Sequence, residues 1–410
     1  MGDKGFKIIS IVGARPNFMK MAAISRAVAA SNQRREAPHI ENIIVHTGQH
    51  YDERMSALFF RDLEIPRPLY NLEVGSASHA AQTAEIMKRF EPVLLKERPD
   101  ALLLMGDVNS TVACALVASK IRIRRSPGTG MWRPLIAHVE AGLRSHDRDM
   151  PEEINRLLTD ALSDLLFITE KDALGNLRAE GIASGKIHLV GNVMIDSLIA
   201  SRKRAEELDV TGSLPELLDP EYPGNRRPGL RPKEYGIITL HRPGNVDSPG
   251  LLGPFVDCIG RIASMVPLIF PLHPRTRDRL KRFGFLEELA GNGNVIFTRP
   301  LGYLEFLGML LGSRMVLTDS GGVQEETTYL GIPCITLREN TERPVTVTMG
   351  TNYLVGTSPA RILDAAFGVI EGRSKTGSIP PLWDGKTGER IVDILQNELA
   401  LRAFLSTCAG

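Results

Sequence analysis

Short runs of apolar and β-branched residues alternate along the chain with longer segments in which apolar residues recur at helical period. In the first half, the short runs predict strands at residues 7–12, 42–46, 101–105, 135–139 and 165–168. The segments between them predict helices at residues 20–30, 78–95 and 110–120. This alternation is typical of a parallel sheet with helices on both faces.

The same pattern starts again in the second half of the chain, with strands predicted at residues 236–240, 267–272, 295–297, 315–318 and 334–337. Residues 215–232 are rich in Pro, Gly and Arg and predict a surface loop. A second break at residues 372–381 precedes a final helix at residues 389–405. The chain is therefore predicted to be α/β, with two Rossmann-like, doubly wound parallel-sheet domains.

The predicted N-terminal domain spans residues 1–192 and is completed by a C-terminal helix at residues 386–410. The C-terminal domain spans residues 193–385. Two such sheets would face a cleft at the carboxyl ends of their strands, which is where folds of this kind bind ligands.

Composition narrows the class of protein. The length of 410 residues is too great for one ordinary core, and 43% hydrophobic and 24% charged residues are typical of globular proteins. A formal net charge of +1 gives no general attraction for nucleic acid. No stretch approaches the roughly 20 apolar residues of a membrane span. The first residues lack the features of a signal peptide, so we expect a cytoplasmic protein. Four cysteines lie far apart, which argues against structural zinc or a disulfide framework.

Polar residues follow several predicted strands. The loop GARPNFMK holds one glycine, so it is not a dinucleotide fingerprint. Its Arg15 and Lys20 flank a helix N-terminus, which suits a diphosphate, although a tight turn with solvated basic residues explains them equally. Asp107 follows the strand at residues 101–105, where it would lie at the ligand edge or cap the next helix.

Two more acidic motifs follow. Glu140 comes after a nearly wholly apolar run, so we expect it to be partly buried with a raised pKa, as a general acid or base requires. The alternative is an internal ion pair with Arg144. Glu152 and Arg156 lie four residues apart at the start of a helix, where a surface salt bridge explains them equally well. The apolar stripe expected for that helix is Ile154, Leu157, Leu158, Ala161, Leu162 and Leu165.

A histidine directly follows each of two predicted strands in the second half of the chain. His241 and His273 occupy equivalent positions after consecutive strands, which favours a role in handling protons or phosphate. Among the single motifs, the segment DSGGVQEE gives the strongest indication of a ligand-binding site.

Its Ser320, Gly321 and Gly322 open a helix and allow a ligand to approach the backbone closely, as an anion site needs. Glu326 lies about one turn further, within reach of a ribose diol. Arg343 supplies another arginine for phosphate.

The motifs in order resemble one family, the UDP-N-acetylglucosamine 2-epimerases. They are GARPNFMK, HTGQH, GDVNST, HVEAGLRS, MPEEINR, GNVMIDSL, the pair His241-Arg242, DSGGVQEE and TERP, between residue 7 and about residue 350. The resemblance implies a GT-B fold, a UDP-sugar substrate, no metal or cofactor, and a homodimer. It also implies reversible inversion at sugar C2, in which UDP is eliminated to give a 2-acetamidoglucal and is then added back.

The resemblance further implies roles for individual residues. Asp107, Glu140 and Glu152 would handle protons, with His241 near the diphosphate. The residues expected to bind the substrate are Arg15, Lys20, Arg156, His273, Phe306, Ser320, Gly321, Gly322, Glu326 and Arg343. Phe306 would line the uracil pocket, although ordinary core packing also explains it.

Two departures from the family pattern bear on the substrate. Gln49 and His50 match a run through which many bacterial members bind a second, activating UDP-sugar, but the next two residues differ, so the resemblance to that allosteric site is incomplete. Asn17 stands where many members carry Glu, as in relatives that act on other 2-acetamido sugars such as diacetamido uronic acids. Alternatives that stay open are an epimerase of such a sugar, a hydrolysing epimerase, a GT-B glycosyltransferase and a non-catalytic UDP-sugar sensor.

Overall fold

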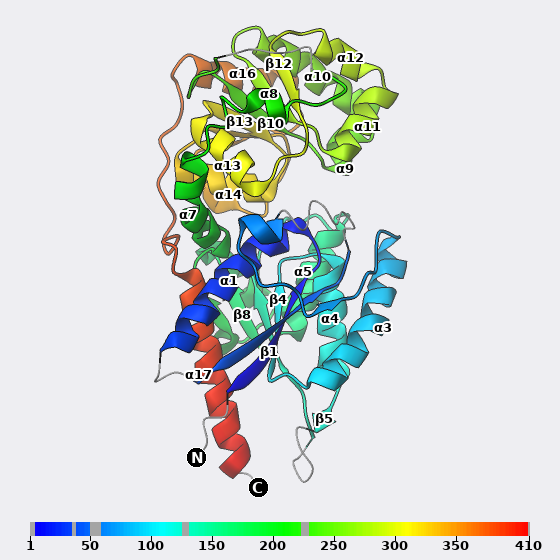
Figure 1. Cartoon of the computed structure of the whole chain (residues 1–410), viewed down its shortest axis with the longest axis vertical. Coiled ribbons are helices and arrows are strands. Elements are labelled where there is room, and N and C mark those ends of the chain that lie inside the picture. Colours follow the sequence, from blue (N-terminus) through cyan, green and yellow to red (C-terminus); the bar gives the residue numbers. More distant parts are fainter. Residues whose placement is uncertain (1–4, 35–37, 50–58, 125–130, 223–228, 409–410) are drawn as a thin grey trace. The chain divides into compact units, whose positions relative to one another are not determined.

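The computed structural model describes residues 5–34, 38–49, 59–124, 131–222 and 229–408. The chain divides into two compact units, which are described separately (Figure 1). Unit 1 comprises Met1–Ser197 and Pro381–Gly410, and unit 2 comprises Leu198–Pro380.

Unit 1 is built on a seven-stranded parallel sheet with the order β3-β2-β1-β4-β7-β8-β9. Its strands are β1 (Phe6–Val12), β2 (Ile40–His46), β3 (Tyr70–Asn71), β4 (Ala101–Met105), β7 (Leu135–Val139), β8 (Leu165–Ile168) and β9 (Ile187–Leu189). The chain order reverses between β1 and β4, so the loops that follow these two strands lie at the topological switch point, where doubly wound sheets bind ligands.

The helices of unit 1 connect these strands. They are α1 (Arg15–Gln33), α3 (His79–Glu97), α4 (Asn109–Lys120), α5 (Pro151–Leu162), α6 (Lys171–Ala179), the start of α7 (Val193–Glu206) and α17 (Thr387–Cys408). The 3₁₀ turn η1 (Ser184–Lys186) precedes β9, and the strands β5 (Ile123–Arg124) and β6 (Met131–Trp132) form a small antiparallel pair. The C-terminal helix α17 packs along α1 (Figure 1). Just before it, the buried Trp383 donates its indole N–H to the carbonyl of Thr169 at 3.4 Å, which anchors the returning chain to unit 1.

Unit 2 repeats the architecture with six parallel strands in the order β12-β11-β10-β13-β14-β15. The strands are β10 (Gly236–Thr239), β11 (Leu268–Pro271), β12 (Val295–Thr298), β13 (Met315–Thr318), β14 (Cys334–Thr336) and β15 (Asn352–Leu354). The helices are α8 (Leu214–Leu217), α9 (Pro243–Val246), α10 (Pro249–Ala263), α11 (Pro274–Arg282), α12 (Phe285–Ala290), α13 (Tyr303–Gly312), α14 (Gly321–Leu330), α15 (Pro344–Thr348) and α16 (Pro359–Ile370). Here the switch point lies between β10 and β13.

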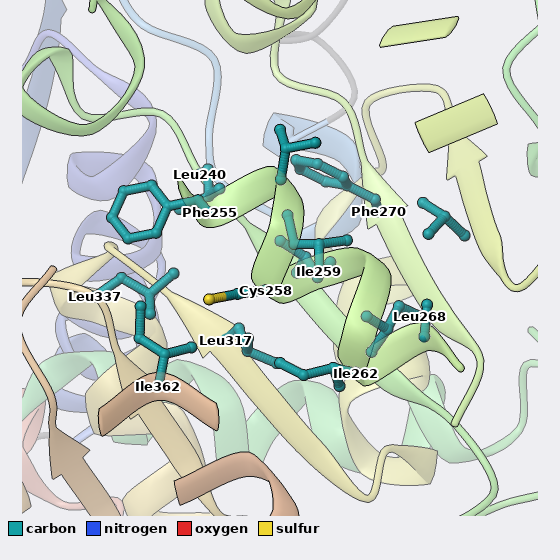
Figure 2. Packing of buried hydrophobic residues seen from close by; sticks show 14 of the residues in the cluster. Leu240, Phe255, Cys258, Ile259, Ile262, Leu268, Phe270, Leu317, Leu337 and Ile362 are labelled. Atoms are coloured by element: carbon teal, nitrogen blue, oxygen red, sulfur yellow. The ribbon is translucent and has the colours of Figure 1, made fainter. Parts of the chain in front are cut away.

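The core of unit 2 explains why its strands are almost continuously apolar. Phe255, Ile259 and Ile262 of α10 belong to one buried cluster with Leu268 of β11 and Leu317 of β13 (Figure 2). Because helices cover both faces of a parallel sheet, successive strand residues are buried whichever way they point. This burial fixes the positions of the strand ends, which carry the polar loops.

The structure confirms the predicted strands within a residue or two and adds short ones. Strands β3, β9 and β15 have only two or three residues each, which is too short for a hydrophobic pattern. The loop predicted at residues 215–232 was partly wrong, because α8 lies at its start. Leu217 of α8 is buried, and Leu218 forms an isolated bridge with Thr298. No helix in the described part of the chain is long and apolar enough to span a bilayer.

Helix α5 is turned the opposite way from the prediction. Ile154 and Leu158 of the expected core stripe are 38% and 45% exposed. The buried side of the helix is polar and consists of Glu153, Asn155, Arg156, Thr159 and Asp160. These side chains are tolerated inside because each charged one meets an opposite charge or a hydrogen-bond donor, from α5 itself, from β7 or from the loops after β4 and β7.

Candidate functional site

The switch point of unit 1 is closed by Asn17 in the first turn of α1. Its side-chain oxygen accepts hydrogen bonds from the amides of Gly13 and Ala14, both at 3.0 Å, and its amide group donates to the carbonyl of Met105 at 2.8 Å. The loop after β1 is thereby tied to the end of β4. Asn17 is the residue whose identity the sequence connected with the choice of sugar. In the structure its side chain bonds to backbone groups.

One turn further along α1, Lys20 forms a buried ion pair with Glu140. The Lys20 ammonium lies 2.6 Å from Glu140 Oε2, and the two side chains are 4% and 3% exposed. Glu140 was expected to be buried and is. The alternative prediction, an ion pair of Glu140 with Arg144, is wrong. Arg144 instead pairs with Asp160 and Glu180.

The backbone around this ion pair is unusual. Glu140 has φ +71°, a left-handed conformation that residues with a side chain seldom adopt. Gly106, opposite, has φ +66°, and a Cβ atom there would lie 2.8 Å from Lys20 Nζ. The chain therefore accepts strain at Glu140, and needs glycine at position 106, in order to hold the carboxylate and the ammonium together.

Asp107 is held by a second buried ion-pair network. Arg156 Nη1 lies 2.6 Å from Asp107 Oδ2, and Arg156 Nη2 lies 2.8 Å from Glu153 Oε2. The surface salt bridge predicted between Glu152 and Arg156 is therefore wrong, because Arg156 points inward with the polar side of α5. Asp107 is 28% exposed at the outer end of the network, whereas Glu152 is half-buried and forms no ion pair with the described residues.

Glu153 is a buried residue of this region that the sequence did not single out. Its carboxylate accepts from the amide of Ser145 at 2.9 Å and the amide of His146 at 3.1 Å, besides Arg156. Burial alone would raise the pKa of Glu153, but the Ser145 amide and Arg156 together hold it below its ordinary value. Two adjacent glutamates on a helix look alike in a sequence, and only the rotation of α5 distinguishes them.

A third buried network of polar side chains joins His138 to Asp160. The buried Asp160 accepts from His138 Nδ1 at 2.6 Å, from the amide of Gly142 at 3.0 Å and from Arg144 Nη2 at 2.6 Å. The other ring nitrogen of His138 lies 2.8 Å from the carbonyl of Gly106. Burial would raise the pKa of Asp160, but His138 and Arg144 keep it below the usual range. The group fixes the turn that carries Asp107.

Of the remaining expected residues of unit 1, one contacts the start of α4 and two lie outside the described part of the chain. The side-chain carbonyl of Gln49 accepts from the amide of Ser110 at 3.1 Å and from its hydroxyl at 2.7 Å, which caps the first turn of α4. His50 and the side chain of Arg15 lie outside the described part of the chain.

At the switch point of unit 2, Asp319 organises the loop after β10. Fully buried, it accepts from the amides of His241 and Arg242 at 3.1 and 2.9 Å and from the side chain of Asn245 at 3.2 Å. The ring of His241 lies beside it and also near the ring of His273, whose centroid is 5.8 Å away. The structure thus brings together the two histidines predicted from equivalent strand ends.

Arginines gather near the first turn of α14, whose N-cap residue is Ser320. Arg343 Nε lies 2.8 Å from the buried Glu325, and a Cβ atom on Gly321 would come within 2.5 Å of Arg343 Nη1. Gly321 therefore permits the guanidinium to lie against the helix N-terminus. An arginine beside free backbone N–H groups makes this end of α14 suited to an anion.

The conformation of the loop between β14 and α15, which carries Arg338 and Arg343, depends on Glu342. Its buried carboxylate accepts from Arg338 at 2.8 Å through both guanidinium nitrogens, and Arg242 and Arg343 lie at 3.4 and 3.5 Å. Burial opposes ionisation, but these arginines hold the pKa of Glu342 far below its ordinary value. The negative charge of Glu342 therefore fixes arginines that come from two different loops.

Glu326, expected near a ribose, is buried within α14. It accepts a hydrogen bond from the hydroxyl of Tyr303 at 3.1 Å. Burial, together with the nearby charge of Glu325, raises the pKa of Glu326 to about 7. Phe306 lies on the same helix as Tyr303 and is partly exposed, so it is not part of the buried core. Gly322 follows Gly321 in the first turn of α14.

Comparison with known proteins identifies relatives over nearly the whole chain. The family model described as UDP-N-acetylglucosamine 2-epimerase matches residues 32–396. A UDP-N-acetylglucosamine 2-epimerase of Methanocaldococcus jannaschii is 42% identical over 391 residues, which is 95% of this chain and 98% of the relative. A UDP-2,3-diacetamido-2,3-dideoxy-D-glucuronate 2-epimerase of Pseudomonas aeruginosa is 41% identical, covering 88% of this chain and 91% of the relative.

A solved structure agrees with these relatives. The crystal structure of the M. jannaschii UDP-GlcNAc 2-epimerase in complex with UDP-GlcNAc and UDP matches with a TM-score of 0.82 at 41% identity. The match covers 95% of this chain and 99% of that one. The predicted fold class, α/β with two doubly wound parallel sheets of GT-B type, is confirmed. Among the described residues, no group of His, Cys, Asp and Glu is arranged to hold a metal ion.

The ion pair of Lys20 and Glu140 can be tested by a double-mutant cycle. Lys20→Met leaves a buried carboxylate without its cation, so we expect the free energy of unfolding to fall by about 3–5 kcal/mol. Adding Glu140→Gln should recover part of this loss, because no buried charge then remains. Urea denaturation of the two single variants and the double variant measures the coupling. Effects that add within about 0.5 kcal/mol would contradict a direct interaction.

The raised pKa of Glu326 gives a pH dependence with a definite sign. Folding raises this pKa from 4.5 to about 7, so the stabilisation is present below pH 4.5 and is lost as the pH rises toward 7. The loss amounts to about 3 kcal/mol at about 1.4 kcal/mol per pH unit. Glu326→Gln keeps the acceptor for Tyr303 without the charge. Its thermal unfolding midpoint should therefore rise relative to the wild type between pH 5 and pH 8.

The exposed Glu287→Gln on α12 serves as the control for the Glu326 measurement, and its curve should run parallel to that of the wild type. If Glu326→Gln also ran parallel, or lost stability with rising pH, the buried carboxyl would not have the raised pKa.

Proposed function

The chain belongs to the UDP-N-acetylglucosamine 2-epimerase family, and from this premise we propose that it interconverts UDP-N-acetylglucosamine and UDP-N-acetylmannosamine. In the proposed reaction the bond between C1 and the UDP oxygen breaks while the proton on C2 is removed. The products of this half are a 2-acetamidoglucal and UDP. A proton then adds to the opposite face of C2, and UDP re-forms the bond to C1. The sugar is inverted without hydrolysis.

The observation that carries this proposal is the buried ion pair of Glu140 and Lys20 beside the turn of Asp107. The Lys20 ammonium favours the charged form of Glu140, and a carboxylate of fixed position is the group that removing a proton from carbon requires. Asp107, oriented by Arg156, and the half-buried Glu152 are the candidates to return a proton to the other face. Two separate acid–base positions are what an inversion needs, because the proton leaves and returns on opposite faces.

We assign the binding of the nucleotide to the switch point of unit 2. The N-terminus of α14, Arg343 and Arg242 would bind the diphosphate, whose negative charge grows as it leaves C1. Glu326 would bind the ribose, and the partly exposed Phe306 would contact the uracil. His241 and His273 would lie beside the phosphates.

The sugar accepted and the assembly are further parts of the proposal. We propose UDP-N-acetylglucosamine as the substrate, although the Pseudomonas relative named for a diacetamido uronic acid is almost equally similar. The family resemblance also leads us to propose a cytoplasmic homodimer. The apolar residues Ile154 and Leu158, exposed on α5, would be better buried against a second subunit.

Hydrogen exchange at C2 tests the reaction directly. The protein is incubated with UDP-N-acetylglucosamine in deuterated water and the sugar is followed by NMR. We expect deuterium at C2 in nucleotide-bound sugar of both configurations. Free N-acetylmannosamine would instead indicate a hydrolase, and turnover only with an added acceptor a glycosyltransferase. Exchange only with the nucleotide of the diacetamido uronic acid would show that the proposed substrate is wrong and would support the proposed reaction.

The variant that tests Glu140 in this assay is Glu140→Gln. Its exchange rate should fall by about 100-fold or more, the range that a general acid or base contributes, while calorimetry should find UDP affinity unchanged. Glu85→Gln, an isosteric change on the outer part of α3 where Glu85 pairs with its helix neighbours Lys88 and Arg89, should exchange at the wild-type rate. Full activity in Glu140→Gln would remove this residue from the mechanism.

A further inference from the structure

The carboxylate of Asp319 is surrounded by hydrogen-bond donors. Besides the amides of His241 and Arg242 and the side chain of Asn245, it faces Nδ1 of the His241 ring, 2.8 Å from Oδ1. Burial would raise the pKa of Asp319, but His241 and these amides hold it below its ordinary value. Asp319 is therefore an ionised group that can only accept hydrogen bonds.

This arrangement fixes where the proton of His241 lies. A nitrogen 2.8 Å from an ionised carboxylate must carry a proton, so Nδ1 is the donor. In the neutral ring Nε2 then holds the lone pair. The side chain is 41% exposed, and Nε2 forms no hydrogen bond with the described residues. Nε2 is thus the position at which His241 gains or loses a proton.

The neighbouring imidazole of His273 is fixed in the opposite way. His273 is the N-cap of α11, and its Nδ1 lies 3.3 Å from the backbone nitrogen of Arg275. A backbone amide can only donate, so Nδ1 of His273 must be the acceptor, and its proton is on Nε2. The two rings have centroids 5.8 Å apart with an angle of 44° between their planes.

We propose that Asp319 and the Arg275 amide fix His241 and His273 in opposite tautomers, with Asp319 acting as a positioning residue for the departing diphosphate. The inference rests on the proposed function. His273 would donate from Nε2 to a phosphate oxygen as a neutral ring. His241 can take a proton from water on its exposed Nε2 and become an imidazolium that donates to Asp319 on one side and to phosphate on the other. The pair would then offer two donors and one positive charge as negative charge develops on UDP.

Asp319→Asn separates this role from a purely structural one. The asparagine oxygen can still accept from the amides of His241 and Arg242, so the loop keeps its anchors. Its NH₂ group, however, replaces an acceptor near His241 Nδ1 with a donor, which forces the proton of His241 to Nε2 and opposes formation of the imidazolium. A wrong tautomer of this kind is a known way to inactivate a carboxylate–histidine pair with little change in geometry.

The tautomers are measured by ¹⁵N NMR of protein labelled at the histidine ring nitrogens, with His241→Gln and His273→Gln used to assign the signals. In the wild type we expect a protonated Nδ1 in His241 and a protonated Nε2 in His273. Asp319→Asn should invert His241 and leave His273 unchanged. A wild-type His241 with a bare Nδ1, or an Asp319→Asn protein with unchanged His241 signals, would overturn the proposal.

Kinetics give the second measurement. Asp319→Asn should lower kcat by about 100-fold or more, with a smaller change in KM. Asp257→Asn removes a carboxylate that is exposed on α10 of the same unit. It should keep both the tautomers and kcat. Unchanged kcat in Asp319→Asn would also overturn the positioning role. A wild-type protein without epimerase activity would refute the proposed function, while the NMR measurement would still decide the tautomers.

Discussion

A buried carboxylate is tolerated only where cations or N–H groups surround it, and this constraint shapes both switch points of the chain. In unit 1, Glu140 meets Lys20, and Glu153 meets Arg156 together with two loop amides. In unit 2, Asp319 meets His241 and the amides beside it. Lys20, the Ser145 and His146 amides and His241 come from other elements or loops than the carboxylate they meet, whereas Arg156 lies on the same helix as Glu153 and reaches on to Asp107. The polar loops are held in place by these pairs, and the sheets only bring them near one another.

The sequence predicted the sheets better than it predicted the contacts at their ends. Apolar runs such as residues 101–105 identify buried parallel strands, and the glutamate after such a run, Glu140, was expected to be buried and is. Its partner was not found, because Lys20 lies 120 positions earlier in the chain and local spacing pointed to Arg144. A pairing across the sheet depends on strand order, which a single sequence does not display.

Helix α5 shows a second limit. Its apolar residues at helical spacing predicted an inward face, but Ile154 and Leu158 are exposed and the polar side is buried. The rule that apolar faces turn inward fails where a helix covers a polar strand end. Leaving the charges there without partners would cost more free energy than leaving two apolar side chains exposed. This rotation also decides which of two adjacent glutamates, Glu152 or Glu153, is left accessible.

The account depends on where the protons lie, and neutron diffraction of crystals exchanged into deuterated water at neutral pH locates them most directly. We expect three deuterons on Lys20 Nζ, none on the carboxylate oxygens of Glu140, and one on His241 Nδ1 facing a bare Asp319. A deuteron on Glu140 or on Asp319 would contradict the account, because the buried carboxyls would then be neutral and the partners around them would not be needed to hold a charge.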